Sequence, residues 1–479
     1  MDRRNEALTP DPSPKGRGNW DALTPPSAPL SRIAGEGMGA RAGDKCHDPY
    51  LRCALYGAAQ AALGVRGCCV LSHSPQGCFQ LVDAAFGWQN ADYTETLTLC
   101  TKLCEDEIVH GGEDVLARTI LEARELDVPI MFVVTGCGPE IVGDDVEAVC
   151  EDVSSRVAFQ VVPIKCAGFR GDQNQGTDIA LDAILRQLVP DDDAERFPRS
   201  VLLVAPHANA NPTWMGDLTW VEAVLARLGA TVVARLTHDT ALSDFQKVPL
   251  AEGCIVLSHD AGQKAADYLA RRFGIEQWCR DLPLPVGFTN TRRWLTELGR
   301  RLGAEAEAGR LVAEGEKMVV EACRRKGLEQ SAMHRAPAAI VADATVGVPL
   351  LRFIAEDLEM IPELVCLRSG QAGVAEMLGR ELAELGFEPK VVHDADVYQA
   401  KTALAEMRPE MVFGSNVERH AVEDLGIPYV FRLVNPISRF RMIDREYFGY
   451  VGMLNLIESI QNDWMDRYRS KARRYRARW

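Results

Sequence analysis

The sequence of 479 residues has no apolar run that approaches the roughly 18–20 residues of a membrane-spanning helix. The N-terminus also lacks the apolar segment of a secretion signal. We therefore expect a cytoplasmic protein without membrane contact. Positive charge is scarce too, because 53 Lys and Arg stand against 68 Asp and Glu, for a net charge of -15. Such a chain is poorly suited to nucleic acid, whose phosphates bind cationic surfaces.

The motifs of several common chemistries are missing as well. The sequence has no GxxxxGK[ST] phosphate loop and no GxGxxG after an apolar strand, so nucleotide binding has no support. It also lacks the HExxH zinc helix and the GxSxG nucleophile turn. Any chemistry of this chain must therefore rest on other residues.

What the sequence contains is the composition of a globular protein, with 47% hydrophobic and 25% charged residues. Short apolar runs such as Val128–Thr135, Val201–Ala205 and Thr231–Ala234 alternate with helical segments such as Leu218–Leu228. Continuous apolar runs are typical of buried parallel strands, and their alternation with helices indicates βαβ units. We predict an α/β protein with three doubly wound, Rossmann-like parallel-sheet domains.

Changes in composition divide the chain into parts. The first residues are rich in Pro, Ser and Gly, which predicts disorder, with the wrapping of a partner as the alternative. Linkers rich in Pro and charge separate the α/β blocks. The predicted parts are a disordered extension (1–44), three α/β domains (45–199, 200–335 and 336–462) and a basic C-terminal helix or tail (463–479).

Fourteen cysteines are many for a reducing compartment, where disulfides are uncommon. Cys53 opens an alanine-rich helical segment, Cys78 closes the sequence SHSPQGC, and Cys137 follows the apolar run Val128–Thr135. Ligands of open parallel sheets collect beyond the carboxyl ends of the strands, and iron–sulfur clusters are held by thiolates. The spacing alone matches neither a zinc site nor a ferredoxin, so buried structural thiols remain the alternative.

Several segments resemble the nitrogenase component 1 family, specifically its β subunits. Cys53–Gly64 resembles the segment of the first cluster cysteine, His73–Cys78 the family's H-G-x-Q-G-C, and Cys137–Asp145 its T-C-x-x-E-x-I-G-D-D. Further resemblances in the same order are Gly168–Gly171, Pro283–Leu298, Asn435–Ile437 and Gly449–Leu456. The resemblance covers about 46–462 and implies the three-domain fold of component 1.

The resemblance also implies a function. Cys53, Cys78 and Cys137 would hold this chain's half of a P-type [8Fe-7S] cluster, and a homologous α-like subunit would hold the other half. The implied partners are that subunit, in an α2β2 assembly, and an ATP-dependent [4Fe-4S] reductase dimer. The chain would then be an oxidoreductase subunit that relays electrons to a catalytic cofactor in the α-like subunit, with no catalytic residue of its own.

Departures from the nitrogenase pattern bear on the substrate. Gly168 stands where the family has a serine that can ligate the oxidised cluster, and Phe86–Asn90 replaces an H-F-R-E-P-like stretch. We therefore expect a nitrogenase-like reductase and favour methylthio-alkane reductase, which cleaves carbon–sulfur bonds of small thioethers. The alternatives are a dinitrogen-reducing β subunit and a cofactor-assembly scaffold.

Other residues near these motifs have structural expectations. His73 is expected to position its loop, and Asp144 and Asp145 are expected to cap a helix. The roles of Cys46, Cys104 and Cys166 stay open, although Cys166 lies beside the G-F-x-G turn. His259 is a minor candidate for a cofactor ligand, because the α-type V-H-C pattern is absent around it.

Overall fold

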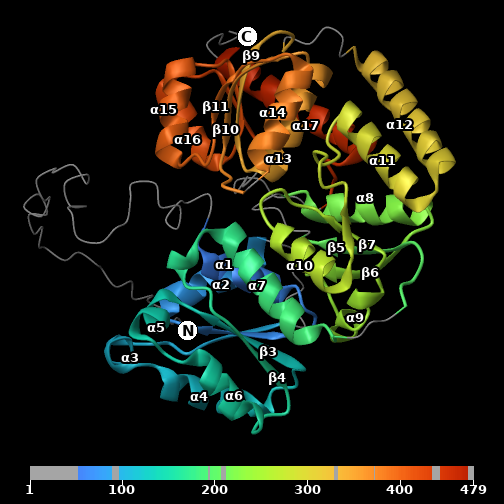
Figure 1. The fold of residues 1–479 in the computed structure, drawn as a ribbon. Helices are drawn as coiled ribbons and strands as arrows, with labels where there is room; N and C mark the ends of the chain where they lie inside the picture. The colour runs from blue at the N-terminus through green and yellow to red at the C-terminus, as the bar shows by residue number, and fades with distance from the viewer. Residues whose placement is uncertain are drawn as a thin grey trace, which may run out of the picture. The chain divides into compact units, whose positions relative to one another are not determined.

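The computed structural model describes residues 52–88, 96–191, 195–205, 212–327, 333–371, 373–433 and 443–472. The predicted extension, Cys46, the segment Asn435–Ile437 and the end of the basic tail lie outside these residues. Within the described part, no helix is both long and apolar enough to cross a membrane. The strands form three parallel sheets, which confirms the predicted α/β class (Figure 1).

The first sheet has four parallel strands in the order β2-β1-β3-β4. These strands are β1 (Cys69–His73), β2 (Leu97–Cys100), β3 (Ile130–Thr135) and β4 (Gln160–Ile164). The helices of this block are α1 (Ala54–Leu63), α2 (Gln76–Trp88), α3 (Glu105–His110), α4 (Glu113–Glu122), α5 (Cys137–Val142), α6 (Val146–Ser154) and α7 (Gln173–Leu188), with 3-10 turns at Ala123–Glu125 and Gly168–Arg170. The predicted strand Val128–Thr135 is β3, all of whose residues are buried.

Side chains that alternate along β3 enter two separate cores, as the two-residue period of a strand requires. Phe132 and Val134 pack with α1 and α7. Met131 and Val133 pack with α4 and α6 on the opposite face. Helices therefore cover both faces of the sheet, which is the doubly wound arrangement that the sequence predicts (Figure 1).

The second sheet has the order β6-β5-β7-β8 and is also parallel. Its strands are β5 (Ser200–Val204), β6 (Thr231–Leu236), β7 (Gly253–Val256) and β8 (Glu276–Trp278). Its helices are α8 (Trp214–Arg227), α9 (Leu242–Phe245) and α10 (Gln263–Phe273), with a 3-10 turn at Val248–Leu250, and α11 (Phe288–Leu302) and α12 (Glu305–Lys326) follow. The predicted helix Leu218–Leu228 lies within α8 apart from its last residue.

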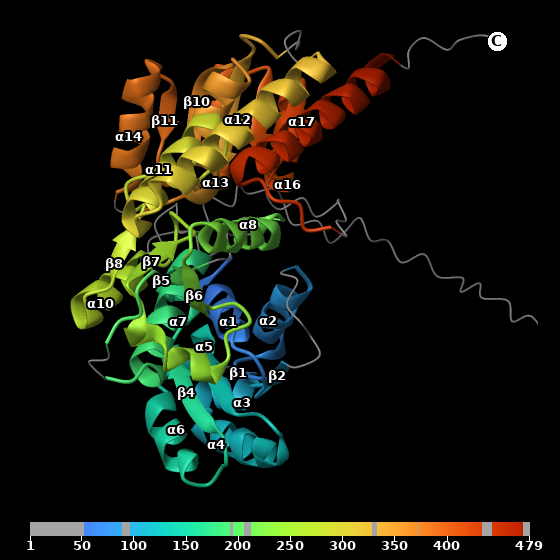
Figure 2. The same ribbon diagram turned by 90° about the vertical axis from the view of Figure 1, so that its right-hand side faces the viewer.

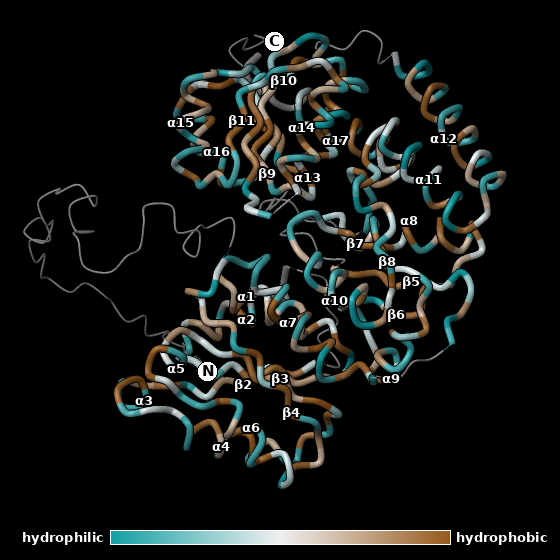
Figure 3. The backbone as a smooth tube through the Cα atoms, viewed as in Figure 1, coloured by the Kyte–Doolittle hydropathy of each residue, from teal (hydrophilic) through white to brown (hydrophobic). Residues whose placement is uncertain are grey.

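The third sheet has five parallel strands in the order β11-β10-β9-β12-β13. Figure 2 labels two of them, β10 and β11. The strands are β9 (Pro337–Ala342), β10 (Ile361–Leu367), β11 (Lys390–Val392), β12 (Met411–Gly414) and β13 (Tyr429–Arg432), and Figure 3 shows the first three as largely apolar. The helices are α13 (Ala344–Arg352), which continues into a π-helical turn (Phe353–Asp357), then α14 (Val374–Leu385), α15 (Val397–Met407), α16 (Asn416–Leu425) and α17 (Gly449–Ala472).

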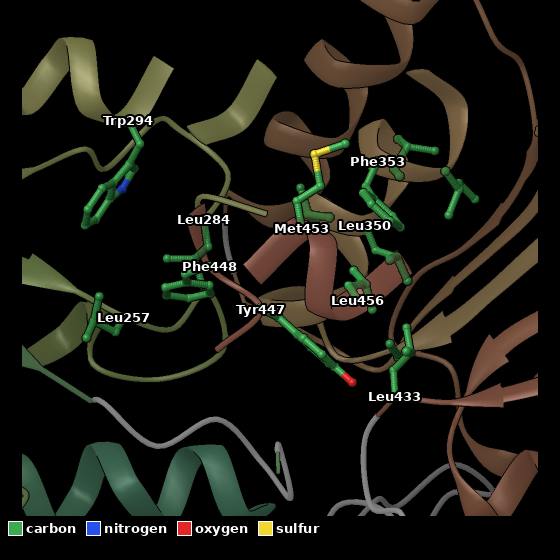
Figure 4. Close-up of a cluster of buried hydrophobic side chains, with 14 of the residues drawn as sticks. Leu257, Leu284, Trp294, Leu350, Phe353, Leu433, Tyr447, Phe448, Met453 and Leu456 are labelled. Atoms are coloured by element: carbon green, nitrogen blue, oxygen red, sulfur yellow. The ribbon is translucent and has the colours of Figure 1, made fainter. Parts of the chain in front are cut away.

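The C-terminal segment packs into a core that contains residues of both the second and the third block. Tyr447 and Phe448 donate their backbone N–H groups to one oxygen of buried Asp217, at 2.6 and 2.9 Å. The backbone N–H of Gly449 donates to Pro285 O at 2.8 Å, so two of the resembling segments contact each other. The surrounding apolar side chains are Leu257, Leu284, Trp294, Leu350, Phe353, Leu433, Met453 and Leu456 (Figure 4).

Candidate metal centre

Each of the three predicted cluster cysteines lies at the start of a helix. Cys53 is the N-cap of α1, Cys78 is in the first turn of α2, and Cys137 is the first residue of α5. The first turn of a helix has backbone N–H groups without a partner inside the helix, and these can donate hydrogen bonds to a nearby sulfur. All three thiols are partly exposed and none is in a disulfide.

Gly168 brings two of these cysteines together. Its backbone N–H donates a hydrogen bond to Sγ of Cys137 at 3.2 Å. A Cβ placed on Gly168 would lie 3.1 Å from Cys137 Sγ, 3.3 Å from Cys53 Cβ and 3.6 Å from Cys53 Sγ. Both thiols therefore border one small space that a side chain at position 168 would fill.

Cys78 belongs to the same neighbourhood. Burial raises the pKa of its thiol, and the nearby thiols of Cys137, Cys53 and Cys100 raise it further. Among the described residues, no three His, Cys, Asp or Glu side chains have the spacing of a single-ion site. Soft thiol donors around a space kept open by a glycine are, in contrast, the donor set of an iron–sulfur group, so these residues fit such a group.

A buried carboxylate holds the loop of Gly168 against Cys137. Glu140 follows Cys137 on α5 and accepts a hydrogen bond from the backbone N–H of Ala167 at 2.9 Å. It also accepts from the hydroxyl of Thr135 and pairs with Arg170. The Glu140 side chain is only 5% exposed, whereas that of Arg170 is 43% exposed. The acidic residue of the C-x-x-E segment thus joins the loops that follow β3 and β4, a role that sequence reasoning missed.

Two glycines let α1 and α7 approach closely enough to place Cys53. A Cβ on Gly57 would overlap Gln173 O, and one on Gly176 would overlap Ala54 O. The N–H of Ala54 donates to Gly171 O at 2.9 Å, which fastens the start of α1 beside the Gly168 turn. Gly57 and Gly176 are therefore required by backbone contact between the two helices.

His73 and Asp144 form a buried pair behind the cysteines. His73 Nε2 lies 3.1 Å from Asp144 and Nδ1 lies 3.2 Å from the Thr101 hydroxyl, so the histidine holds its loop as expected. Burial is the main cause that lowers the pKa of His73. The helix-capping role predicted for both aspartates holds for Asp145, which caps α6. It is wrong for Asp144, which instead accepts the backbone N–H of Gly112 at 3.0 Å.

The remaining candidate residues make other contacts. Cys166 is fully buried, and its thiol donates to Thr135 O at 3.7 Å. Cys104 is exposed and begins α3. His259 Nε2 accepts the backbone N–H of Leu284 at 3.2 Å, so this nitrogen is already used inside the protein.

Comparison with known proteins identifies the family of the chain. The sequence matches the family described as nitrogenase component 1 type oxidoreductase over residues 53–465. The chain belongs to this family. It is 26% identical over 456 residues to the nitrogenase molybdenum-iron protein beta chain of Methanococcus maripaludis, with 88% of this chain and 95% of that protein covered.

Two further matches extend the comparison. The nitrogenase iron-molybdenum cofactor biosynthesis protein NifE of Clostridium pasteurianum is 24% identical over 405 residues, which covers 81% of this chain and 82% of that protein. The fold matches the structure entitled "Nitrogenase Cp1 at pH 6.5" with a TM-score of 0.75 and 18% identity, over 92% of this chain and 97% of that one. The predictions of a β-like component 1 protein and of an oxidoreductase subunit are thereby confirmed.

Proposed function

We propose that this chain is the β-like subunit of a nitrogenase-like reductase and that Cys53, Cys78 and Cys137 hold its share of a P-type [8Fe-7S] cluster. The observation that carries the proposal is the packing of Cys53 and Cys137 against Gly168, beyond the carboxyl ends of β3 and β4. Bound there, the cluster would supply one-electron chemistry. The proposed role of the subunit is electron relay.

The residues of this chain would prepare the site in two ways. The N–H of Gly168 donates to Cys137 Sγ, and such outer hydrogen bonds tune sulfur ligands. Glu140, through Ala167 and Arg170, holds the two loops in register so that the thiols are positioned before iron arrives.

The proposed partners are a homologous α-like subunit, in an α2β2 assembly, and an ATP-dependent [4Fe-4S] reductase dimer. The partly exposed thiols support a partner that completes the site. Ile141 and Phe169 lie close in sequence to Cys137 and Gly168, and their side chains are 72% and 54% exposed. Exposed apolar side chains in an isolated chain are typical of a surface that a partner subunit covers. The proposed compartment is the cytoplasm, whose reducing conditions keep thiols free for iron.

For the substrate, we favour small thioethers, with the catalytic centre in the α-like subunit. Gly168 supports a departure from dinitrogen reduction, because its Cβ position has no room for a serine without movement of Cys137 or Cys53. A dinitrogen-reducing β subunit is the alternative supported by the molybdenum-iron relative. A cofactor-assembly scaffold is the alternative supported by the similarity to the biosynthesis protein.

The test is anaerobic co-purification of this chain with its α-like partner, followed by iron quantification and EPR with and without dithionite. Cys53→Ala, Cys78→Ala and Cys137→Ala should each remove cluster iron and its redox-active signal. Cys150→Ala is the matched control, because Cys150 is buried in the core on the opposite face of the sheet. Iron that survives all three substitutions would refute the ligand assignment.

The active complex then separates the candidate functions. Two-electron reduction of a thioether, with release of a thiol and a hydrocarbon together, supports the favoured substrate class, whereas ammonia formation supports the nitrogenase alternative. A cluster that leaves the chain on gel filtration, with neither turnover, supports the scaffold.

A further inference from the structure

Every strand of the first sheet has a cysteine at or just beyond its carboxyl end. Because parallel strands end at the same edge of a sheet, these cysteines share that edge. They are Cys100 at the end of β2, Cys78 beyond β1, Cys137 beyond β3 and Cys166 beyond β4. Two of the four, Cys100 and Cys166, have no role in the function proposed above.

We propose that Cys100 is a fourth thiol ligand at this site, so that the chain can hold a [4Fe-4S] cluster on cysteines of its own. This inference rests on the proposed function and deepens it. A cluster of this class takes four cysteines, and Cys53, Cys78 and Cys137 provide three. With Cys100 the set is complete in one chain, before any partner subunit binds.

The position of Cys100 follows from the pairing of β1 with β2. Cys100 lies opposite Ser72 in the parallel register, next to the carboxyl end of β1. Its thiol donates to Ser74 O at 3.3 Å. Ser74 belongs to the short loop that leads into α2, where the backbone N–H of Cys78 donates to Pro75 O at 3.1 Å. The sulfur of Cys100 therefore lies against the loop that positions Cys78.

The sulfur of Cys100 also accepts a backbone hydrogen bond. The N–H of Lys102 donates to Cys100 Sγ at 3.3 Å, as the N–H of Gly168 does to Cys137 Sγ at 3.2 Å. Lys102 adopts a left-handed conformation with φ of 56°, which is unfavourable for a residue with a side chain. Burial raises the pKa of the Cys100 thiol, while the N–H and the charge of Lys102 oppose that rise.

The other two cysteines near this edge do not have these properties. Cys166 is fully buried in an apolar core with its thiol on Thr135 O. Cys104 is exposed, and its thiol donates to Lys102 O at 3.4 Å. Cys100, in contrast, shares the partial exposure of Cys53, Cys78 and Cys137.

The experiment uses the full chain without its partner, reconstituted anaerobically with ferrous iron and sulfide. Iron and acid-labile sulfide per chain are measured, and EPR spectra are recorded after dithionite reduction. We expect about four irons per wild-type chain. Cys100→Ala should lower bound iron at least two-fold and abolish the signal of the reduced cluster. Cys104→Ala, in the same segment, should match the wild type.

Cys137→Ala separates failure of this inference from failure of the proposed function. If Cys137→Ala loses iron and Cys100→Ala keeps the wild-type iron and spectrum, Cys100 is not a ligand and the proposed site stands. If both keep their iron, both assignments are overturned. A wild-type chain that binds iron only in complex with its partner also overturns the inference but not the proposed function.

Folding is checked by far-UV circular dichroism and gel filtration. If Cys100→Ala does not fold, Cys100→Ser replaces it, since a hydroxyl keeps the size of the thiol. The serine variant should then shift the midpoint potential of the reconstituted cluster or lower its iron content. An unchanged potential with unchanged iron would overturn the inference.

Discussion

Replacing Gly176 by alanine should loosen the contact that places Cys53. A Cβ on Gly176 would overlap Ala54 O and lie 2.6 Å from Ala54 Cα, whereas ordinary contacts begin at 3.4 Å. These are backbone atoms of α1, so no flexible side chain can move aside. Overpacking of this kind costs about 1–3 kcal/mol or more, which outweighs the gain of about 1 kcal/mol when alanine replaces glycine in a helix. Because the overlap is with backbone, the upper end of this range applies, and we expect a net loss of about 2 kcal/mol or more in the free energy of unfolding.

Urea denaturation checks this loss, and Gly379→Ala is the matched control. Gly379 lies within α14 and has nothing within 4 Å of its Cβ position, so its substitution should stabilise the chain. Because the start of α1 carries Cys53, Gly176→Ala should also lower iron retention in the complex, which Gly379→Ala should not do. Equal stabilisation by the two substitutions would show that the α1–α7 contact is not as close as described.

Three further outcomes follow from buried carboxylates. Burial raises the pKa of the Asp178 carboxyl from 3.8 to about 6. The proton that it binds therefore stabilises the fold fully below about pH 3.8, and this stabilisation is lost as the pH rises through 6. Asp178→Asn should therefore raise the free energy of unfolding in urea at pH 8 by about 2–3 kcal/mol and change it little at pH 4. Asp182→Asn, at a half-exposed position of the same helix, should show neither effect. Glu140→Ala leaves the N–H of Ala167 without its acceptor and should lower iron per complex more than two-fold; full iron retention would contradict its positioning role. Asp144→Ala removes the acceptor of Gly112 and the partner of a buried histidine, and should lower the thermal midpoint by an amount equivalent to about 1–3 kcal/mol.

The sheets could be predicted from the sequence because several strands are marked by a continuous apolar run within a few residues. Val128–Thr135 and Val201–Ala205 are continuous apolar runs, and each largely coincides with a buried strand. A strand with helices on both faces needs apolar side chains in both directions, so the run itself indicates the environment. The helix that begins after Cys53 was predictable for the same reason, from its alanines and the glycine that ends it.

The contacts behind the cysteines were not predictable, because each joins residues far apart in the chain. Asp144 was expected to cap a helix like its neighbour Asp145, and a local rule does place Asp145 there. The partners of Asp144 are His73 and Gly112, which are brought near by the pairing of β1 with β3 and by the loop before α4. Two adjacent aspartates thus have different partners, because Asp145 caps the helix that follows it whereas Asp144 bonds residues far away in the chain.

Three glycines show how a local sequence signal differs from the contact that it makes possible. In the sequence, Gly57, Gly168 and Gly176 signal only a turn or a weak helix position. In the structure, all three mark places where one backbone or sulfur atom approaches another so closely that a Cβ would intrude. Gly57 and Gly176 set how far α1 stands from α7, and Gly168 sets how close Cys137 stands to Cys53. The separation of the thiols is therefore decided by helix packing as much as by the cysteines themselves. A substitution at Gly57 or Gly176 should consequently act on the proposed metal site without replacing any of the proposed ligands.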